Sequence, residues 1–358
     1  MILRAFYKRL QRNWKRRRRL WRFDHQAKAY FEKRLQPSLG MSAPALLTDH
    51  YARKKYAAFL PSGKVFIKLY RGKAVKGARR YVAVHPLLSK YDVRIPELIA
   101  ADTGAESLRR YNLGSVVLRW VEGKTIAPGN SAGARAAFAN LGKLHCIGPS
   151  QSAEEKASGG NVTAPPLLTR TAMENVSHWM LEAIRLCHPR FGAAEERLAR
   201  QLTKRSLSGL FAEETPLVLL HMDYAPSNLL QVADGQIVTL DFEDARFGNV
   251  CFDLGAALFR FEFGEGPEEA EEAALAELIG SPRFDPFLEA YSATAPSWTL
   301  SLWEKLRRPA LEWGCLSLAW HLARKSAYSF RYGRADRQRF ARKAQRWWRQ
   351  LARYAEAT

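Results

Sequence analysis

The sequence predicts an α+β protein that is long enough for two lobes. Short apolar runs separated by turn residues between residues 43 and 70 are typical of antiparallel strands. Helical periodicity follows in several segments between residues 134 and 326, interrupted at residues 216–255 by two short apolar runs around a polar loop. A chain of 358 residues can build a sizeable core in each of two lobes.

Positive charge is concentrated at the two ends of the chain. Residues 1–37 contain 13 Lys and Arg against two acidic residues, a net of +11, and residues 321–358 contain 11 against two, a net of +9. The total is +21, so the 283 residues between the ends carry only +1. We therefore expect a nearly neutral body with basic helical extensions at residues 1–40 and 331–358.

Cysteine usage and hydropathy favour a cytoplasmic protein. The four cysteines are scattered, without the spacing of a zinc site or of a disulfide framework. No apolar run approaches the ~20 residues of a membrane span, and the first residues are basic instead of forming the apolar region of a secretory signal.

The N-terminal extension has an amphipathic pattern. One helical stripe over residues 1–36 contains Leu3, Tyr7, Leu10, Trp14 and Trp21, and most arginines lie off it. Such a helix can lie on an anionic membrane surface, where each Lys or Arg near the lipid heads adds about 1 kcal/mol. Packing on the body with a solvated basic face is the main alternative, and binding to nucleic acid phosphates is the weakest.

The C-terminal extension is a second candidate for membrane contact. Residues 332–354 are basic and contain interleaved aromatic residues, which are Phe340, Trp347 and Trp348. Together the two ends favour a peripheral position on the inner face of the membrane.

Strands are predicted in the first part of the body. Residues 45–47, 56–60 and 64–70 form three antiparallel strands, and the turn Pro61-Ser-Gly63 joins the last two. Lys68 lies inside the third strand. Further strands are expected at residues 97–100 and from Gly114 to an end at residues 120–123, with a helix around residues 78–89 between the third strand and residue 97.

Residues 216–255 carry the chemistry. His221-Met-Asp223 follows the first apolar run, Asn228 comes five residues after that aspartate, and Asp241-Phe-Glu243 follows the second run. Phosphoryl transfer needs bound metal, a group that orients the acceptor hydroxyl, and fixed geometry. Because Mg²⁺ prefers oxygen ligands, Asp241 and Asn228 suit the metal, and Asp223 suits the acceptor.

This pattern resembles the catalytic and metal-binding loops of the protein-kinase-like fold. The interior Tyr224–Asn228 and Glu243 in place of a glycine are similar to the aminoglycoside phosphotransferase and choline kinase family, near the lipopolysaccharide core sugar kinases. The resemblance covers about residues 43–330. It implies a two-lobed fold, with an antiparallel-sheet N-lobe at residues 41–122 and a mainly helical C-lobe at residues 123–330.

The resemblance also implies cofactors and site residues. ATP and Mg²⁺ are the expected cofactors; Asp223 orients or deprotonates the acceptor, Asn228 and Asp241 hold the metal, and Lys68 steadies the phosphates. The adenine ring is expected to bond to backbone groups of three residues, which are Arg119, Trp120 and Val121. His221 and Asp253 are expected to brace the catalytic loop.

The implied function is transfer of the γ-phosphate to a hydroxyl of a sugar, a glycolipid or an amino alcohol. Only eleven residues separate Asp241 from Asp253, too few for an activation segment of protein-kinase type. Two departures favour a rival reading, a nucleotide-binding pseudokinase that scaffolds a membrane assembly. The segment Thr48–Lys55 contains no glycine, and no acidic residue lies between Lys68 and Asp92. The presence of Asp223, Asn228 and Asp241 favours the active enzyme.

Overall fold

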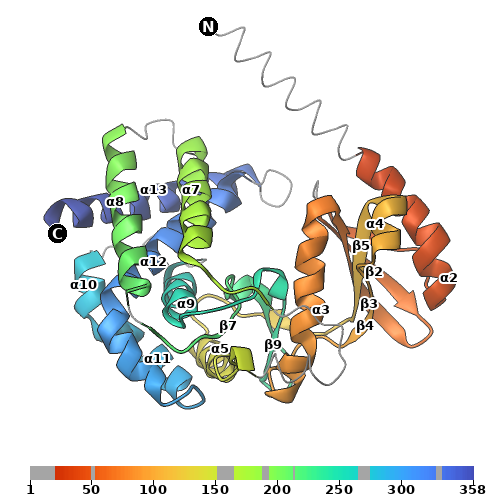
Figure 1. Cartoon of the computed structure of the whole chain (residues 1–358), viewed down its shortest axis with the longest axis horizontal. Coiled ribbons are helices and arrows are strands. Elements are labelled where there is room, and N and C mark those ends of the chain that lie inside the picture. The colour runs from red at the N-terminus through yellow and green to blue at the C-terminus, as the bar shows by residue number, and fades with distance from the viewer. Residues whose placement is uncertain are drawn as a thin grey trace, which may run out of the picture. The chain divides into compact units, whose positions relative to one another are not determined.

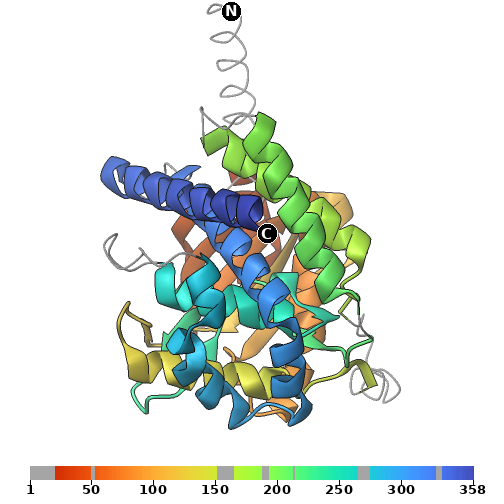
Figure 2. The ribbon, with the colours of Figure 1, turned by 90° about the vertical axis from the view of Figure 1, so that its left-hand side faces the viewer.

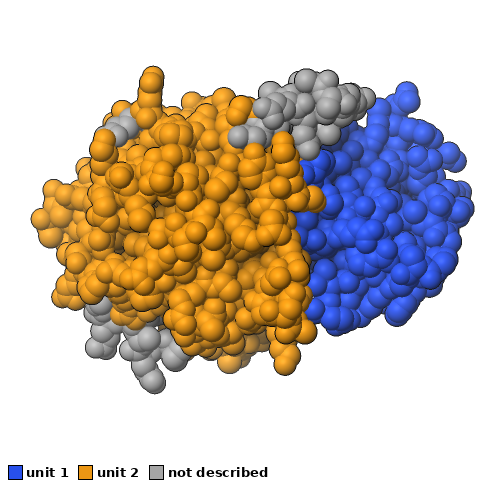
Figure 3. Space-filling model, turned by 90° about the horizontal axis from the view of Figure 1, so that it is seen from below, with its two compact units in different colours: residues 1–86, 95–122 blue, residues 87–94, 123–358 orange. Residues whose placement is uncertain are grey.

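The computed structural model describes residues 21–49, 53–150, 165–187, 193–212, 214–264, 275–327 and 333–358. Two compact units are distinguished, unit 1 with residues 1–86 and 95–122 and unit 2 with residues 87–94 and 123–358 (Figure 3). Most of the predicted N-terminal stripe (Leu3 to Trp14) and most of an acidic helix expected at residues 267–279 lie outside the described residues.

Unit 1 is built on a five-stranded antiparallel sheet with the order β1-β2-β3-β5-β4. Its strands are β1 (Ala45–Asp49), β2 (Arg53–Leu60), β3 (Gly63–Arg71), β4 (Leu98–Asp102) and β5 (Leu113–Arg119). The first two strands are longer than the sequence predicted, so much of the expected loop at residues 48–55 is strand. Lys54 can extend β2 because its side chain is fully buried and pairs with Asp24.

Helices lie on both faces of this sheet. Figure 1 shows α3 (Val75–Lys90) on one face and the helical residues 21–39 on the other, while α4 (Ala105–Tyr111) precedes β5. Residues 21–39 bury Phe23, Tyr30 and Phe31 against sheet residues that include Tyr56 and Ile67.

The described part of the N-terminal extension is thus an integral layer of unit 1. The hydroxyl of Tyr30 lies 2.9 Å from a carboxylate oxygen of Asp102 and 2.9 Å from the hydroxyl of Ser115, which ties the helix to β4 and β5. Trp21, the described member of the predicted stripe, is 62% exposed, so the helix buries a different face. Residues 21–39 therefore pack on the body, but not through the predicted stripe.

Unit 2 is mainly helical, with two small sheets that carry the loops of interest. One sheet pairs β7 (Val218–Leu220) with β10 (Arg246–Gly248), and the other has the order β6 (Lys124–Thr125), β8 (Leu229–Gln231), β9 (Ile237–Thr239). Its longer helices are α5 (Ser131–Leu144), α7 (Arg170–Cys187), α8 (Ala193–Leu210), α9 (Cys251–Phe263), α12 (Trp298–Ala327) and α13 (Arg334–Ala357), and its shorter ones are α10 (Leu275–Gly280) and α11 (Asp285–Ser292).

Two glycines let the backbones of α9 and α12 meet. A Cβ atom on Gly255 would lie 2.1 Å from the carbonyl oxygen of Ala310, and one on Gly314 would lie 2.2 Å from the carbonyl oxygen of Gly255. These distances are well inside van der Waals contact, so only glycine fits on either helix at the crossing.

The C-terminal helix α13 lies across α8 and α12 (Figure 2). Its aromatic residues are in the core: Trp347 is 1% exposed, and Trp348 and Phe340 are 3% exposed. These aromatic side chains are therefore packed inside unit 2 and are not available to a membrane. Membrane contact through the basic face of this helix stays a prediction. Among the described residues, no helix is both long and apolar enough to span a membrane.

Candidate active site

A buried carboxylate anchors the start of the catalytic loop, residues 221–228. Asp253, in the first turn of α9, is 2% exposed and accepts the backbone N–H groups of His221 and Met222, the latter at 2.8 Å. Met222 has φ of +67°, a left-handed conformation that L residues rarely adopt, and the Asp253 bonds hold it there. The predicted bracing role of Asp253 is confirmed.

Opposing effects set the pKa of Asp253. Burial raises it, but the neighbouring imidazoles of His145 and His221 and the backbone N–H bond outweigh burial, so the pKa lies below its usual range. The nearest atom of His145, Nε2, is 3.6 Å from the carboxylate, while its Nδ1 lies 2.9 Å from the hydroxyl of Tyr291. His145 is fully buried, so it is a packed residue of the core.

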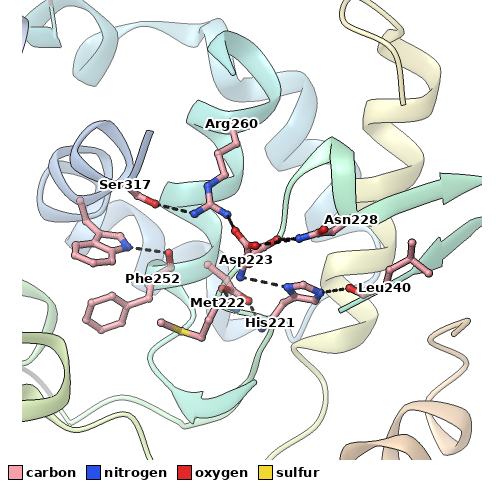
Figure 4. A network of polar contacts seen from close by, with 10 residues as sticks. His221, Met222, Asp223, Asn228, Leu240, Phe252, Arg260 and Ser317 are labelled. Atoms are coloured by element: carbon pink, nitrogen blue, oxygen red, sulfur yellow. Dashed lines mark hydrogen bonds and ion pairs between the residues drawn. The ribbon is translucent and has the colours of Figure 1, made fainter. Parts of the chain in front are cut away.

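His221 and Asn228 hold Leu240 from both sides (Figure 4). Nδ1 of His221 accepts the backbone N–H of Asp223 at 3.2 Å, so Nε2 carries the ring proton and donates to the Leu240 carbonyl at 2.7 Å. The N–H of Leu240 donates to the Asn228 carbonyl at 2.9 Å. Asp241 follows directly with φ of +72°. The clamp therefore ties the strand end that carries Asp241 to the catalytic loop, and the bracing role of His221 is confirmed.

Asp223 is held by two neighbours. Arg260 Nη1 lies 2.6 Å from Asp223 Oδ1, and Asn228 Nδ2 donates to Oδ2 at 3.1 Å and to the Asp223 carbonyl at 2.8 Å (Figure 4). The Asp223 side chain is 25% exposed, whereas Arg260 is 2% exposed. The carboxylate is thus fixed in orientation and still open to a small molecule.

Asn228 and Asp241 form a donor set that fits Mg²⁺. Because Nδ2 of Asn228 faces Asp223, its Oδ1 is the atom left for a metal. Asp241 is half-buried and supplies the carboxylate. The described residues hold no cluster of three or more His, Cys, Asp and Glu that suits a metal ion. A sparse set of one carboxylate and one amide is what Mg²⁺ uses when phosphates and waters complete its shell.

A pocket of about 280 Å³ lies beside this loop in unit 2. Its walls come from α7, the loop at Met222, β10, α9 and α12. The lining residues include Arg246, Arg260, Trp313, Ser317, Trp320 and Arg324. Of the three tryptophans that the sequence places on this last helix, Trp303 is fully buried, whereas Trp313 and Trp320 also line the pocket.

Lys68 lies in unit 1, on the α3 face of the sheet. It is 4% exposed, and it alternates along β3 with Ile67 and Leu69, whose side chains pack against the opposite helical layer. Lys55 is its cross-strand partner on β2. Helix α3 contains no acidic residue, as the sequence indicated.

The strand end at Arg119 to Val121 also lies in unit 1. The N–H of Arg119 donates to the Glu97 carbonyl at 2.9 Å, and that of Trp120 donates to the Lys64 carbonyl at 3.1 Å. Within the part of the chain that the structure describes, no hydrogen bond uses the N–H of Val121. Of the three predicted donors to adenine, Val121 is therefore the one whose N–H remains open.

Sequence reasoning missed Arg260, Ser317 and Arg324. Arg260 donates to the Ser317 hydroxyl at 3.1 Å as well as to Asp223. One signal was present: the α9 sequence CFDLGAALFRFEF is mostly apolar, and a charged residue such as Arg260 in a buried helix needs a partner. Ser317 and Arg324 carry no such signal, because serine and arginine are common in long helices and their partners lie on other elements or one turn away.

Solved structures show the same fold. A putative aminoglycoside phosphotransferase from Ralstonia eutropha aligns with a TM-score of 0.60 and 13% identity, covering 93% of this chain and 98% of that one. The choline kinase LicA from Streptococcus pneumoniae aligns with a TM-score of 0.56 and 15% identity, covering 92% and 100%. The predicted protein-kinase-like fold is confirmed, with an antiparallel-sheet N-terminal part and a mostly helical remainder.

The chain belongs to the phosphotransferase enzyme family, whose model matches residues 46–287. A curated relative, the N-acetylmuramate/N-acetylglucosamine kinase of Pseudomonas putida, is 25% identical over 224 residues. That alignment covers 63% of this chain and 61% of the relative, so the chain spans somewhat less than two thirds of the relative's length.

Proposed function

We propose that this protein is an ATP-dependent kinase that transfers the γ-phosphate to a hydroxyl of a small molecule, a sugar or an amino alcohol. The observation that carries the proposal is the clamp at Leu240, because it brings the side chains of Asp223, Asn228 and Asp241 into one connected loop system. Membership of the phosphotransferase family and the named activity of the Pseudomonas putida relative support the same chemistry.

Asp223 is proposed to receive the acceptor hydroxyl. One carboxylate oxygen is taken by Arg260 and the other accepts only the Asn228 amide, so a lone pair remains for an incoming O–H. A carboxylate that is fixed within hydrogen-bond reach of the acceptor orients the hydroxyl for in-line attack. It takes the proton of that hydroxyl as the phosphoryl group transfers.

Asn228 and Asp241 are proposed to hold Mg²⁺, and Lys68 to contact the phosphates of ATP. The bound metal supplies neutralisation of the charge that develops on the phosphates. In this proposal residues 41–122 provide the nucleotide contacts, with the Val121 N–H toward adenine. Residues 123–330 provide the catalytic loop and the acceptor pocket.

The acceptor is proposed to bind in the pocket lined by α9 and α12. Its volume, about 280 Å³, lies at the lower end of the ~300–1,000 Å³ of small-molecule sites, which favours an acceptor the size of a single sugar. A glycolipid acceptor at a membrane surface is the narrower alternative. The buried aromatic residues of α13 give it no support, and most of the N-terminal stripe that suggested it lies outside the described residues.

The test is transfer of labelled γ-phosphate from Mg-ATP to a panel containing N-acetylmuramate, N-acetylglucosamine, choline and ethanolamine. Asp223→Asn removes the proposed base and is expected to lower kcat by about 10²- to 10⁴-fold. Asp234→Asn is the matched control: it makes the same change in the exposed hairpin of residues 232–236.

The outcomes separate the enzyme from the pseudokinase. Label in an acceptor with the wild type and with Asp234→Asn, but not with Asp223→Asn, supports the kinase. Mg-ATP binding without transfer to any acceptor supports the pseudokinase, which the absence of an acidic residue in α3 suggested.

A further inference from the structure

The pocket beside Asp223 is lined by three arginines, Arg246, Arg260 and Arg324. Two aspartates also line it, but their charges are not equally available to a ligand. Asp253 is buried and accepts two backbone N–H groups of the catalytic loop. Asp244 is exposed to solvent, where water screens its charge. Arg260 is paired with Asp223, so the positive charge that the pocket offers to a ligand comes chiefly from Arg324.

Arg324 is the cation best placed to bind a ligand. It is half-buried, and its guanidinium lies 4.7 Å from the centre of the Trp320 ring. No carboxylate among the described residues lies within ion-pair distance of it. A guanidinium that is stacked on an aromatic ring is held in one orientation, and its in-plane N–H groups remain free to bind a planar or tetrahedral anion.

Arg260 adds a second cation with unused bonding capacity. Nη1 donates to Asp223 and Nη2 donates to Ser317, while Nε is buried and has no hydrogen-bond partner within the described chain. An unsatisfied N–H group in a site that is 2% exposed costs free energy unless a ligand satisfies it.

Further residues of α12, His321 and Lys325, report the positive charge near the pocket. His321 is 6% exposed, and its pKa lies well below the usual value, first because of burial and then because of the charges of Arg260, Lys325 and Arg324. Three cations thus act on one imidazole, and Lys325 is itself only 6% exposed. The field of this cluster points to a negatively charged ligand.

We propose that the acceptor carries an anionic group, a carboxylate or a phosphate, and that Arg324 binds this group with support from Arg260. The inference rests on the proposed function and names the class of its substrate: a hydroxylated acid or phosphate ester about the size of a single sugar. Arg324 is then a residue that determines specificity, while Asp223 receives the hydroxyl of the same molecule.

The two tryptophans of the pocket do not form a site for a quaternary ammonium group. One face of Trp320 is covered by Arg324, and the indole N–H of Trp313 donates to the Phe252 carbonyl at 3.2 Å. The Trp313 ring also meets the Phe252 ring edge to face. A cationic acceptor would enter next to two guanidinium groups, which repel it.

The experiment compares matched neutral and anionic acceptors. The pairs are glucose with glucuronate, galactose with galacturonate, and glucose with glucose 6-phosphate, and choline is the cationic probe. Transfer of labelled γ-phosphate gives kcat and KM, and isothermal titration with the ATP-free protein gives the Kd of each probe. Arg324→Gln keeps a polar side chain of similar shape without charge, and Arg349→Gln on the exposed face of α13 is the control.

Anionic members that exceed their neutral partners at least tenfold in kcat/KM or in affinity support the inference. Arg324→Gln should then raise the KM or Kd of the anionic probe by about 10- to 100-fold, as the loss of one charged hydrogen bond does, without changing kcat. The carboxylate and phosphate arms tell which anion fits. Arg349→Gln should change neither value.

Equal or better use of neutral or cationic acceptors would overturn the inference while the kinase activity stands. If no acceptor is phosphorylated although Mg-ATP binds, the proposed function fails, and the titrations still decide on the anion. Anionic probes that bind no more tightly than their neutral partners, or that bind Arg324→Gln equally well, would overturn the inference in that case too.

Discussion

Arg260 Nη1 lies 2.6 Å from Asp223 Oδ1, and the two side chains differ sharply in exposure, at 2% and 25%. The buried arginine therefore needs the ion pair to compensate its charge more than the aspartate does. Its charge is surrounded by the apolar residues of α9, and Asp223 is the carboxylate that neutralises it. The aspartate, by contrast, can turn to water when its partner is lost.

This asymmetry predicts unequal costs for the two halves of the pair. Asp223→Ala leaves a buried guanidinium without a carboxylate and should lower the free energy of unfolding by about 3–5 kcal/mol. Arg260→Met replaces the buried charge by an apolar chain of similar length and should change stability by about 1 kcal/mol or less. Urea denaturation of both variants measures the difference. Equal destabilisation would show that the exposed carboxylate depends on the pair as much as the arginine does.

Asp253→Asn should destabilise the loop that carries the site. The two carboxylate oxygens each accept one backbone N–H group, and asparagine keeps only one oxygen acceptor. The variant should therefore lose about one charged hydrogen bond, or about 1.5–3 kcal/mol, on thermal or urea unfolding. Because the pKa of Asp253 is lowered in the fold, its contribution is present above the unfolded value of about 3.9 and is lost as the pH falls further. The variant should therefore lose less stability than the wild type below pH 4. An unchanged acid limb would contradict this.

His321 should make the protein less stable in mild acid. Its pKa in the fold is well below 6.5, so below pH 6.5 the unfolded chain binds a proton that the folded chain does not. Stability then falls as the pH is lowered from 6.5 toward the folded pKa, by up to about 1.4 kcal/mol per pH unit from this group. His321→Gln should flatten the profile between pH 6.5 and 5. A slope that is the same in both proteins would refute the assignment, as would a charged His321 ring seen by NMR at pH 6.

Trp347→Ala should destabilise the packing of α13 on α9. It should not act by weakening a membrane contact. The side chain is 1% exposed and packs against the rings of Phe259 and Phe263, so its removal should cost about 3–5 kcal/mol. Arg349→Gln on the exposed face of the same helix should cost less than about 0.5 kcal/mol. A stable Trp347→Ala protein that no longer binds anionic vesicles would restore the membrane interpretation.

Lys54→Met should loosen the helical layer formed by residues 21–39. Lys54 is fully buried and pairs with Asp24 of that layer, while its ammonium also lies 5.2 Å from the centre of the Phe23 ring. Methionine keeps the apolar stem but loses both interactions, so amide exchange in residues 21–39 should become faster. Lys28→Met, which affects only an exposed pair with Glu32, should leave exchange unchanged. Equal exchange in all three proteins would mean that apolar packing alone holds the layer.

The sequence was sufficient for the fold and for the loop that carries the candidate site. The order of His221, Asp223, Asn228 and Asp241 is local, and its turns and short strands have strong signals, so the elements could be predicted from the sequence and the roles from the family resemblance. The bonds of His221 to Leu240 and of Asp253 to the loop follow that expectation.

What the sequence could not give depends on contacts between distant segments. Arg260 and Ser317 meet only because two helices cross, and nothing in either segment specifies the partner. The same holds for the two ends of the chain, where aromatic residues between arginines fit a membrane surface and a protein core equally well. Burial of Trp347 depends on whether α9 and α12 offer it a surface, and this information is not local.

The glycine crossing of α9 and α12 fixes two walls of the pocket in which the acceptor is proposed to bind. Arg260 follows Gly255 by five residues and Ser317 follows Gly314 by three, so both pocket residues are measured from the point where the two backbones touch. The spacing between the catalytic loop and the far wall is therefore fixed by main-chain contact. Side chains on that wall can be exchanged by mutation while the distance from Asp223 to the backbone of the wall stays the same. In this architecture selectivity for the acceptor can evolve separately from the geometry of phosphate transfer.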